Sequence, residues 1–209
     1  ESSSGKSTAA KLISKKYNLF CMHSGLLFRY ASYLIIKHKP KKIIPFLRKK
    51  FRNLKYKKIT HLNLHSQKIS NHVATLAKQK KIREIMRIFQ KKIIKQHHQI
   101  CCEGRDQASV ILRKNPRYDV AFYFKCNLSV ASLRRWIDLK KKVPLIEVKK
   151  SLRTRTLLDK KRTHNPLKKM ADAVLIRTDI LSKKAMVTKM SKEIDKKLIL
   201  KYGRNFKAR

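Results

Sequence analysis

Hydrophobic residues recur along this chain with two periods, which predict alternating helices and strands. In residues 7–18 the apolar side chains fall on one face of a 3.6-residue repeat, as is typical of an amphipathic helix. The longest pattern of this kind covers residues 66–96, with a break expected around 79–81. The same spacing predicts further helices over residues 25–37, 129–142, 144–163 and 182–200.

Short apolar runs between these segments predict buried strands, at residues 19–22, 100–102, 120–124 and 173–176. Strands that alternate with helices indicate an α/β fold with a mostly parallel sheet. Ligands bind such sheets at the carboxyl ends of the strands. Residues 38–58 are basic and contain two prolines, so we interpret them as a loop or a small insert.

The charge of the chain narrows the choice of partner. The chain has 209 residues and is 42% hydrophobic, which is enough for one domain with a core. It carries 55 Lys and Arg residues against 12 Asp and Glu residues, a net charge of +43. Such a balance favours nucleotides, nucleic acid or an anionic surface as partners, although a solvated lysine-rich surface is an equally good explanation of much of it.

Other compositional signals are mostly negative. No apolar run approaches the ~18 residues of a membrane span, so we expect a cytoplasmic protein with no membrane partner. The four cysteines form no C-x-x-C pair, and no Cys/His spacing is typical of zinc. Cys101 and Cys102 lie in an apolar stretch, and we expect them to be reduced core residues.

The first eight residues, ESSSGKST, fit most of the phosphate-binding pattern G-x-x-x-x-G-K-[ST]. The first glycine of the pattern would be the residue before Glu1. In such a loop, backbone N–H groups and the helix N-terminus hold phosphates, Lys6 reaches the β- and γ-phosphates, and the Ser7 hydroxyl binds Mg²⁺. The alternative is a serine-rich tail that caps a helix.

Two polar turns follow predicted strands. In HSGLLFRY (residues 23–30), Ser24 and Arg29 place a hydroxyl and a guanidinium near one strand end; a capping serine and a surface arginine are the alternative. In CCEGRDQASV (residues 101–110), Arg105 can chelate a phosphate or a base edge and Asp106 can orient a polar ring. The alternative for that stretch is a simple surface turn.

A basic helix is predicted to carry a third polar group. Arg155, Asp159 and Arg162 are spaced i, i+4 and i+7, which puts them on one helix face. Two arginines that flank a carboxylate can clamp a phosphate while the carboxylate accepts a hydroxyl. An exposed row of ion pairs on a solvated helix is the alternative.

Five stretches together, in this order, resemble bacterial cytidylate kinase, a nucleoside monophosphate kinase family of P-loop proteins. They are SSSGKST, SGLLFR, IREIMRIFQ, EGRDQASV and RTLLDKKRTHNPL, and the likeness runs from residue 1 to about residue 195. The resemblance implies the P-loop kinase fold, a parallel sheet flanked by helices, with a shortened insert and a helical lid. It further implies a single kinase domain over residues 1–209, with its core at 1–37, 66–130 and 164–200, a monophosphate-binding insert at 38–65 and the lid at 131–163.

The resemblance also implies a role for each matching residue. Catalytic roles fall to Lys6, Arg155 and Arg162, which would approach the transferred phosphate. ATP would be held by the loop residues Ser4, Gly5, Lys6, Ser7 and Thr8 and by the lid arginines Arg134 and Arg135, with Ser7 as the Mg²⁺ ligand. The acceptor would contact Ser24 and Arg29, with Arg83 on its phosphate, Arg105 and Asp106 on the cytosine ring, and Asp159 on the ribose.

The chain departs from the family pattern at several places. His23 stands where the family has an acidic residue, and Phe28 replaces a tyrosine. Gln107, Ala108 and Ser109 replace x-G-T, and residues 156–158 replace D-x-R. A family member would carry a first strand before Glu1, so we expect the chain to start too far downstream. Without that central strand, which is buried on both faces, we expect poor folding.

The sequence therefore predicts transfer of a phosphoryl group from ATP to CMP or dCMP, with ATP and Mg²⁺ bound, by a monomer. Two alternatives remain open. One is a basic nucleic-acid-binding protein that uses residues 41–58 and 149–169, with affinity that falls steeply in salt. The other is a kinase-like protein that binds nucleotides without turnover. For the kinase we expect no specific nucleic acid partner, only nonspecific attraction to polyanions.

Overall fold

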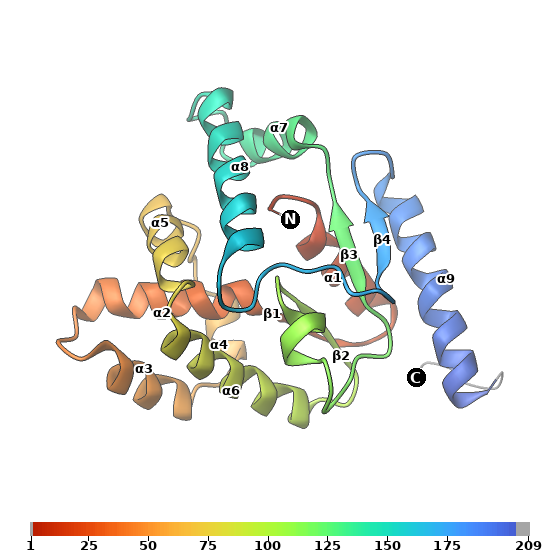
Figure 1. Cartoon of the computed structure of the whole chain (residues 1–209), viewed down its shortest axis with the longest axis horizontal. Coiled ribbons are helices and arrows are strands. Elements are labelled where there is room, and N and C mark those ends of the chain that lie inside the picture. The colour runs from red at the N-terminus through yellow and green to blue at the C-terminus, as the bar shows by residue number, and fades with distance from the viewer. Residues whose placement is uncertain (1, 204–209) are drawn as a thin grey trace. The chain divides into compact units, whose positions relative to one another are not determined.

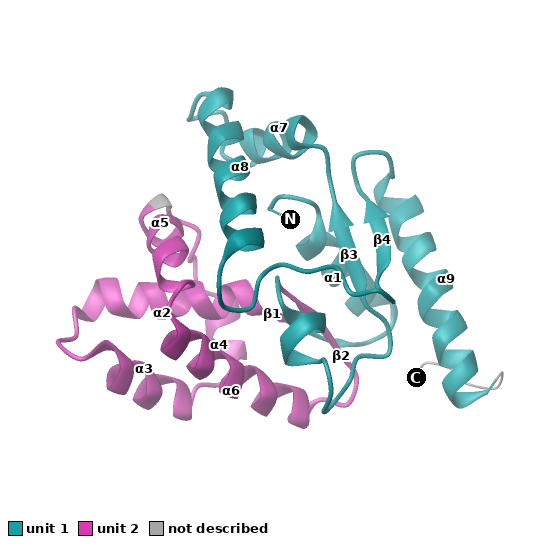
Figure 2. Ribbon diagram, in the orientation of Figure 1, with its two compact units in different colours: residues 1–21, 105–209 teal, residues 22–104 magenta. Residues whose placement is uncertain are grey.

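The computed structural model describes residues 2–203, apart from the side chain of Gln67. The chain divides into two compact units (Figure 2). Unit 1 comprises residues 1–21 and 105–209, and unit 2 comprises residues 22–104. The expected insert at 38–65 lies within unit 2 and the expected lid at 131–163 within unit 1, and their action as insert and lid stays a prediction.

Unit 1 is built around two strands, β3 (Phe122–Lys125) and β4 (Val174–Arg177). They run parallel, with Phe122 opposite Val174 (Figure 1). Helices α1 (Lys6–Lys16) and α9 (Lys183–Tyr202) contribute to the same core as these strands. That core consists of Ala9, Ile13, Tyr17, Phe124, Ile176, Met186 and Met190.

A second cluster in unit 1 joins α7 (Leu128–Asp138) to α8 (Leu145–Lys161). Its buried members are Cys126, Ala131, Val148 and Leu152. The turn between the helices is fixed by Trp136, whose Nε1 donates a hydrogen bond to the carbonyl of Val143 over 2.9 Å. A short π-helical turn, η1 (Gln107–Ile111), follows the EGRD stretch.

Unit 2 is helical, with one complete strand. Its helices are α2 (Ser24–His38), α3 (Ile43–Arg52), α4 (Lys57–Thr60), α5 (Gln67–Leu76) and α6 (Lys80–Gln96). The strand is β2 (Ile100–Glu103). Phe51 of α3 and Phe89 of α6 meet edge to face with ring centroids 5.5 Å apart, which fixes these two helices against each other.

The interpretation of residues 38–58 as a loop is wrong, because most of this segment is helical. Leu47, Phe51 and Ile59 recur at helical spacing and are buried. Pro45 occupies the first turn of α3, where a backbone N–H has no partner within the helix, so proline costs little there. The expected break at 79–81 lies slightly earlier, between Leu76 and Lys80.

The α/β class is confirmed, and so is the parallel direction of neighbouring strands for β3 and β4. Within residues 2–203 the strands lie in two two-stranded sheets, β1 (Phe20–His23) with β2 and β3 with β4. No helix in that range is both long and apolar enough to cross a membrane. Among the described residues the four cysteines form no disulfide, but Cys101 and Cys102 are only half-buried, so the expectation that they are core residues is wrong.

Candidate functional site

The loop before α1 has the conformation that a phosphate-binding loop requires. Gly5 is the N-cap of α1, and its φ of +72° is left-handed, a conformation that glycine adopts without strain. Lys6 opens the helix, and its Nζ donates to Ser4 Oγ over 3.2 Å. The first turn of α1 contains no acidic residue, so its N–H groups and partial positive charge face no competing carboxylate on the helix itself.

Thr178 contacts this loop, although sequence reasoning did not single it out. Its Oγ1 donates to the carbonyl oxygen of Ser4 over 3.2 Å, and Ser4 is completely buried. Thr178 follows β4 directly, at the carboxyl end of the strand. That position is where ligands bind parallel sheets, and it is the one signal in the sequence that could have found this residue.

Arg105, Asp159 and Ser2 lie together in unit 1. Arg105 Nε donates to Asp159 Oδ2 over 2.7 Å, and its Nη2 donates to Ser2 Oγ over 3.2 Å. Arg162 Nη1 approaches the other carboxylate oxygen of Asp159 at 3.4 Å. The EGRD turn, the end of α8 and the start of the phosphate-binding loop therefore meet at one place.

Asp159 is held in its ionised form. Burial by itself would raise the pKa of this carboxyl, but the charge and hydrogen bond of Arg105, together with nearby arginine charges, lower it below its ordinary value. The charges of Arg162 and Arg155 act in the same direction. A permanent negative charge among three arginines keeps their guanidinium groups close together.

The prediction that Arg155, Asp159 and Arg162 share one helix face is wrong for Arg162. Helix α8 ends at Lys161, and Arg162 is its C-cap with an extended backbone. Asn165, three residues on, has a left-handed φ of +55°. Arg162 nevertheless reaches Asp159, because the turn after the helix brings its side chain back toward the last helical turn.

The remaining predicted residues of unit 1 lie at the start of η1, on α7 and on α1. Asp106 is buried and its carbonyl accepts the backbone N–H of Val110, which starts η1. Arg134 of α7 donates from Nη2 to the carbonyl of Thr178 over 2.7 Å. Arg135, the second predicted lid arginine, also lies on α7, and Ser7 and Thr8 lie in the first turn of α1.

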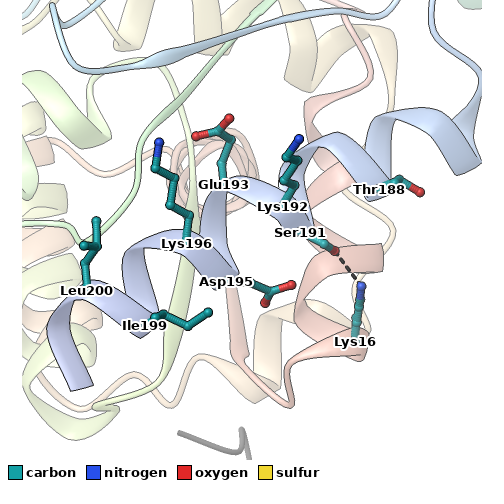
Figure 3. A pocket seen from close by; sticks show the side chains of 9 residues that line it. All are labelled: Lys16, Thr188, Ser191, Lys192, Glu193, Asp195, Lys196, Ile199 and Leu200. Carbon is teal, nitrogen blue, oxygen red and sulfur yellow. Dashed lines mark hydrogen bonds between the residues drawn. The ribbon is translucent and has the colours of Figure 1, made fainter. Parts of the chain in front are cut away.

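A cavity of about 300 Å³ opens beside Ser2 in unit 1. Thr156 and Leu157, two of the residues that depart from the family pattern, line it. A larger cleft, of about 880 Å³, lies along α9 (Figure 3). Lys16 closes one side of that cleft by donating to Ser191 Oγ over 2.7 Å, and no predicted site residue lines it.

Unit 2 carries three of the residues predicted to bind the acceptor, Ser24, Arg29 and Arg83. Ser24 is buried at the start of α2. Arg29 donates to the carbonyl of Leu64 over 2.9 Å and to Ser70 Oγ over 3.0 Å. These bonds tie α2 to the segment that leads into α5.

Arg83 is 7% exposed and donates to the carbonyl of Ala77 over 3.0 Å. Its guanidinium lies over the ring of Phe28, 5.6 Å from the centroid. Phe28 is one of the substitutions relative to the family pattern, and in this chain its ring gives Arg83 a cation–π partner.

His23 and Glu103, at the ends of β1 and β2, form a pair in unit 2. His23 Nδ1 lies 3.2 Å from Glu103 Oε2, and the His23 backbone N–H donates to the Tyr56 hydroxyl over 2.7 Å. An acidic residue at position 23 would place two carboxylates side by side, and histidine removes that repulsion. The sequence reasoning missed Glu103 and Tyr56 because their partner is far away in the chain.

The residues also suit a bound nucleotide triphosphate with its metal. The left-handed glycine, the Lys6 ammonium and the first turn of α1 fit phosphate oxygens. Within residues 2–203 no group of three or more His, Cys, Asp and Glu side chains could hold a metal by itself.

The loop, the parallel strands and the arginine–aspartate group define a P-loop nucleoside monophosphate kinase fold. The family model described as cytidylate kinase matches residues 1–196. The chain therefore belongs to the cytidylate kinase family, whose members are ATP-dependent phosphotransferases.

The sequence is also similar to curated cytidylate kinases over most of their length. The cytidylate kinase of Clostridium botulinum (strain Okra) is 28% identical over 92% of this chain and 93% of its own. That of Aquifex aeolicus is 28% identical over 92% of each chain, and that of Phytoplasma mali is 29% identical over 84% of this chain and 82% of its own. These matches do not favour the alternative of a nucleic-acid-binding protein, and Phe51 and Tyr56, two aromatics of the basic segment, are buried and cannot stack on bases.

Proposed function

We propose that this chain transfers the γ-phosphoryl group of ATP to CMP or dCMP, giving ADP and CDP or dCDP. The observation that carries the proposal is the meeting of Arg105, Asp159 and Ser2 in unit 1. It joins the predicted base-reading turn to the predicted ATP loop within one compact unit. Family membership over residues 1–196 supports the same reaction.

In this proposal the donor nucleotide is held by the start of α1. Backbone N–H groups from Ser4 to Thr8 donate hydrogen bonds to phosphate oxygens, and Lys6 turns from Ser4 Oγ to the β- and γ-phosphates. Ser7 supplies the hydroxyl ligand for Mg²⁺, which when bound neutralises charge on the phosphates. Phosphoryl transfer requires positioning and electrostatic stabilisation more than covalent help from the protein.

Arginines stabilise the transferred group, exclude water and bind the acceptor. Arg155 and Arg162, held beside Asp159, stabilise the charge that develops on the transferred group. Arg134 and Arg135 act from α7 to exclude water over ATP. Ser24, Arg29 and Arg83 bind the acceptor, with Arg83 on its phosphate.

Arg105 and Asp106 read the cytosine, and Asp159 accepts a ribose hydroxyl. For Arg105 this means exchanging its bond to Asp159 for one to the base as the acceptor enters. The protein works as a cytoplasmic monomer that attracts polyanions only nonspecifically.

Replacement of Arg105 by alanine tests the proposal. We expect Arg105→Ala to lower kcat/KM for CMP by roughly 100-fold, in the range found when one preorganised donor is removed from a charged site. The measurement is ADP release in a coupled assay with ATP, Mg²⁺ and CMP, dCMP or UMP. Arg117→Ala is the matched control, because Arg117 forms an exposed ion pair with Asp172 in the same unit. Equal rates for Arg105→Ala and the parent chain would remove Arg105 from the acceptor site.

A further inference from the structure

We propose that Thr178 is a positioning residue for the phosphate-binding loop, and that it connects this loop to Arg134 of α7. The proposal rests on the proposed role of the loop in holding the phosphates of ATP. Thr178 is only 4% exposed, so its polar atoms have to find their partners inside the protein.

The hydroxyl of Thr178 both donates and accepts a hydrogen bond. Oγ1 donates its single proton to the Ser4 carbonyl at 3.2 Å. The same oxygen accepts a hydrogen bond from Arg134 Nη1 at 3.4 Å. One buried oxygen therefore links the phosphate-binding loop to the guanidinium of α7.

The methyl group of Thr178 faces the side of Gly5 on which a side chain would stand. A Cβ built on Gly5 would lie 3.6 Å from Thr178 Cγ2, which is an ordinary van der Waals distance. The threonine side chain therefore lies beside the left-handed turn at Gly5, and its hydroxyl bonds to the residue before that turn.

Thr178 is itself held by the sheet. Its backbone N–H donates to the Lys125 carbonyl over 3.1 Å, which continues the pairing of β4 with β3 by one residue. Its carbonyl accepts Arg134 Nη2 over 2.7 Å. Support for the loop therefore comes from a residue that is hydrogen-bonded to the parallel sheet, and regular elements hold a site more precisely than loops do.

The hydrogen bond to Ser4 has a direct consequence for phosphate binding. The Ser4 carbonyl and the Gly5 N–H belong to one planar trans peptide, so they point in opposite directions. Fixing the carbonyl on Thr178 turns the Gly5 N–H away from Thr178. In the proposed function this N–H is one of the donors that hold the ATP phosphates.

Paired substitutions at Thr178 test this role. We expect Thr178→Val, which keeps the branched shape and loses the hydroxyl, to weaken ATP binding about tenfold, the effect of one lost buried hydrogen bond. Isothermal titration calorimetry with ATP and no acceptor measures this directly. KM for CMP should stay within twofold of the parent value, and Thr178→Ser should restore ATP binding.

Thr60→Val is the matched control for the loss of a threonine hydroxyl. Thr60 Oγ1 donates to the Lys57 carbonyl over 2.7 Å on the exposed helix α4 of unit 2. This variant should bind ATP as the parent chain does. Equal weakening of ATP and CMP by Thr178→Val, or equal loss in Thr178→Val and Thr178→Ser, would overturn the proposal.

A double-mutant cycle with Arg134 separates positioning from direct contact. If Arg134 acts on the loop through Thr178, the effects of Arg134→Met and Thr178→Val on the ATP dissociation constant are not additive. Additive effects would mean that the two residues act independently, and the proposed connection would fail. If Thr178→Val does not fold, Thr178→Ala with Arg134→Met completes the same cycle.

A failure of the proposed kinase activity gives a different pattern. In that case the parent chain itself would release no ADP with CMP, dCMP or UMP. A failure confined to Thr178 would leave the parent turnover intact and the ATP affinity of Thr178→Val unchanged.

Discussion

At the scale of single residues, Asp159 shows how one carboxylate organises several cations. Its side chain is 17% exposed and contacts Arg105 and Arg162. Its pKa lies below the ordinary value despite burial, because Arg105, Arg162 and Arg155 together outweigh the cost of desolvation. Without this carboxylate the arginines of the site would repel one another across a short distance.

The lowered pKa of Asp159 predicts a stability that depends on acid. A carboxyl with a depressed folded-state pKa stabilises the fold above its unfolded pKa of about 3.9, and this contribution is lost as pH falls through the folded value. Asp159→Asn should therefore lower the free energy of unfolding by about 1–3 kcal/mol at pH 7, the range for a lost partly buried charged hydrogen bond. The difference from the parent chain should vanish as the pH falls below that window. Urea unfolding at pH 7 and at pH 3 measures it.

Asp172→Asn is the control for this prediction. Asp172 pairs with Arg117 at an exposed site, where ion pairs contribute little, so a loss as large as that of Asp159→Asn is not expected. A pH-independent loss in Asp159→Asn would mean that packing, and not charge, holds this residue in place.

At the scale of elements, the packing of α1 against α9 holds the helix that follows the phosphate-binding loop. Tyr17, the C-cap of α1, donates its hydroxyl to Asp195 Oδ1 over 2.6 Å and lies in the core of unit 1. Burial, followed by the bond to Asp195, raises the pKa of Tyr17 to about 12. The two terminal helices of unit 1 are thus joined by one buried ring with a polar end.

The raised pKa of Tyr17 predicts a loss of stability in alkali. The unfolded chain releases this proton near pH 10, so the stabilisation is complete below pH 10 and is lost as pH rises toward 12. Tyr17→Phe should cost about 1 kcal/mol at pH 8, the value of one hydrogen bond, and should show a shallower decline above pH 10. Thermal unfolding across this range measures it. Tyr33→Phe, which removes a hydroxyl that accepts from exposed Lys37, should behave like the parent chain.

The sequence predicted elements well wherever the apolar period was regular. All the expected strands and helices exist, within a few residues of their predicted ends. The interpretation of residues 38–58 was wrong because two prolines and many lysines obscured the buried apolar positions Leu47 and Phe51. The prediction that Arg162 lies on the helix face was wrong because it applied helical spacing beyond the true end of α8.

The candidate site was predicted only in part, and the reason is physical. Arg105, Asp159 and Arg162 could be proposed because each lies in a recognisable local motif. Tyr56 could not, since its contact joins residues 33 apart in the chain and leaves no local pattern. For Thr178, whose contact joins residues 174 apart, the position directly after β4 was the one available signal. Local sequence records which residues can do chemistry, whereas the residues that support them are decided by tertiary packing.

At the scale of the whole molecule, the acidic residues are too few to balance the basic ones. Residues 22–104 contain 21 Lys and Arg residues but only Glu84 and Glu103 as acids. Glu103 is already beside His23. Unit 2, which carries three of the predicted acceptor residues, therefore has a strongly positive field toward anions such as CMP.

Because of this positive field, we predict that the rate at which CMP encounters the protein depends on the salt concentration. Raising ionic strength from about 0.02 M to 0.3 M shortens the screening length several-fold and should lower kcat/KM for CMP by roughly tenfold. We expect kcat to change little, because at saturating substrate the association of CMP with the protein does not limit the rate. Steady-state assays in NaCl and in sucrose of equal osmolarity separate screening from solute effects. A fall in kcat with constant kcat/KM would contradict the prediction.

The division into units bears on how the chain folds during synthesis. Unit 2 is one continuous segment, so its contacts can form as soon as residue 104 has left the ribosome. Helix α1 is made earlier, yet Tyr17 bonds to Asp195, which is 178 residues later in the chain. The phosphate-binding loop is thus translated before unit 2 and completed after it, and we expect a nascent chain stalled before α9 to carry a folded unit 2 and an ATP loop that cannot yet bind.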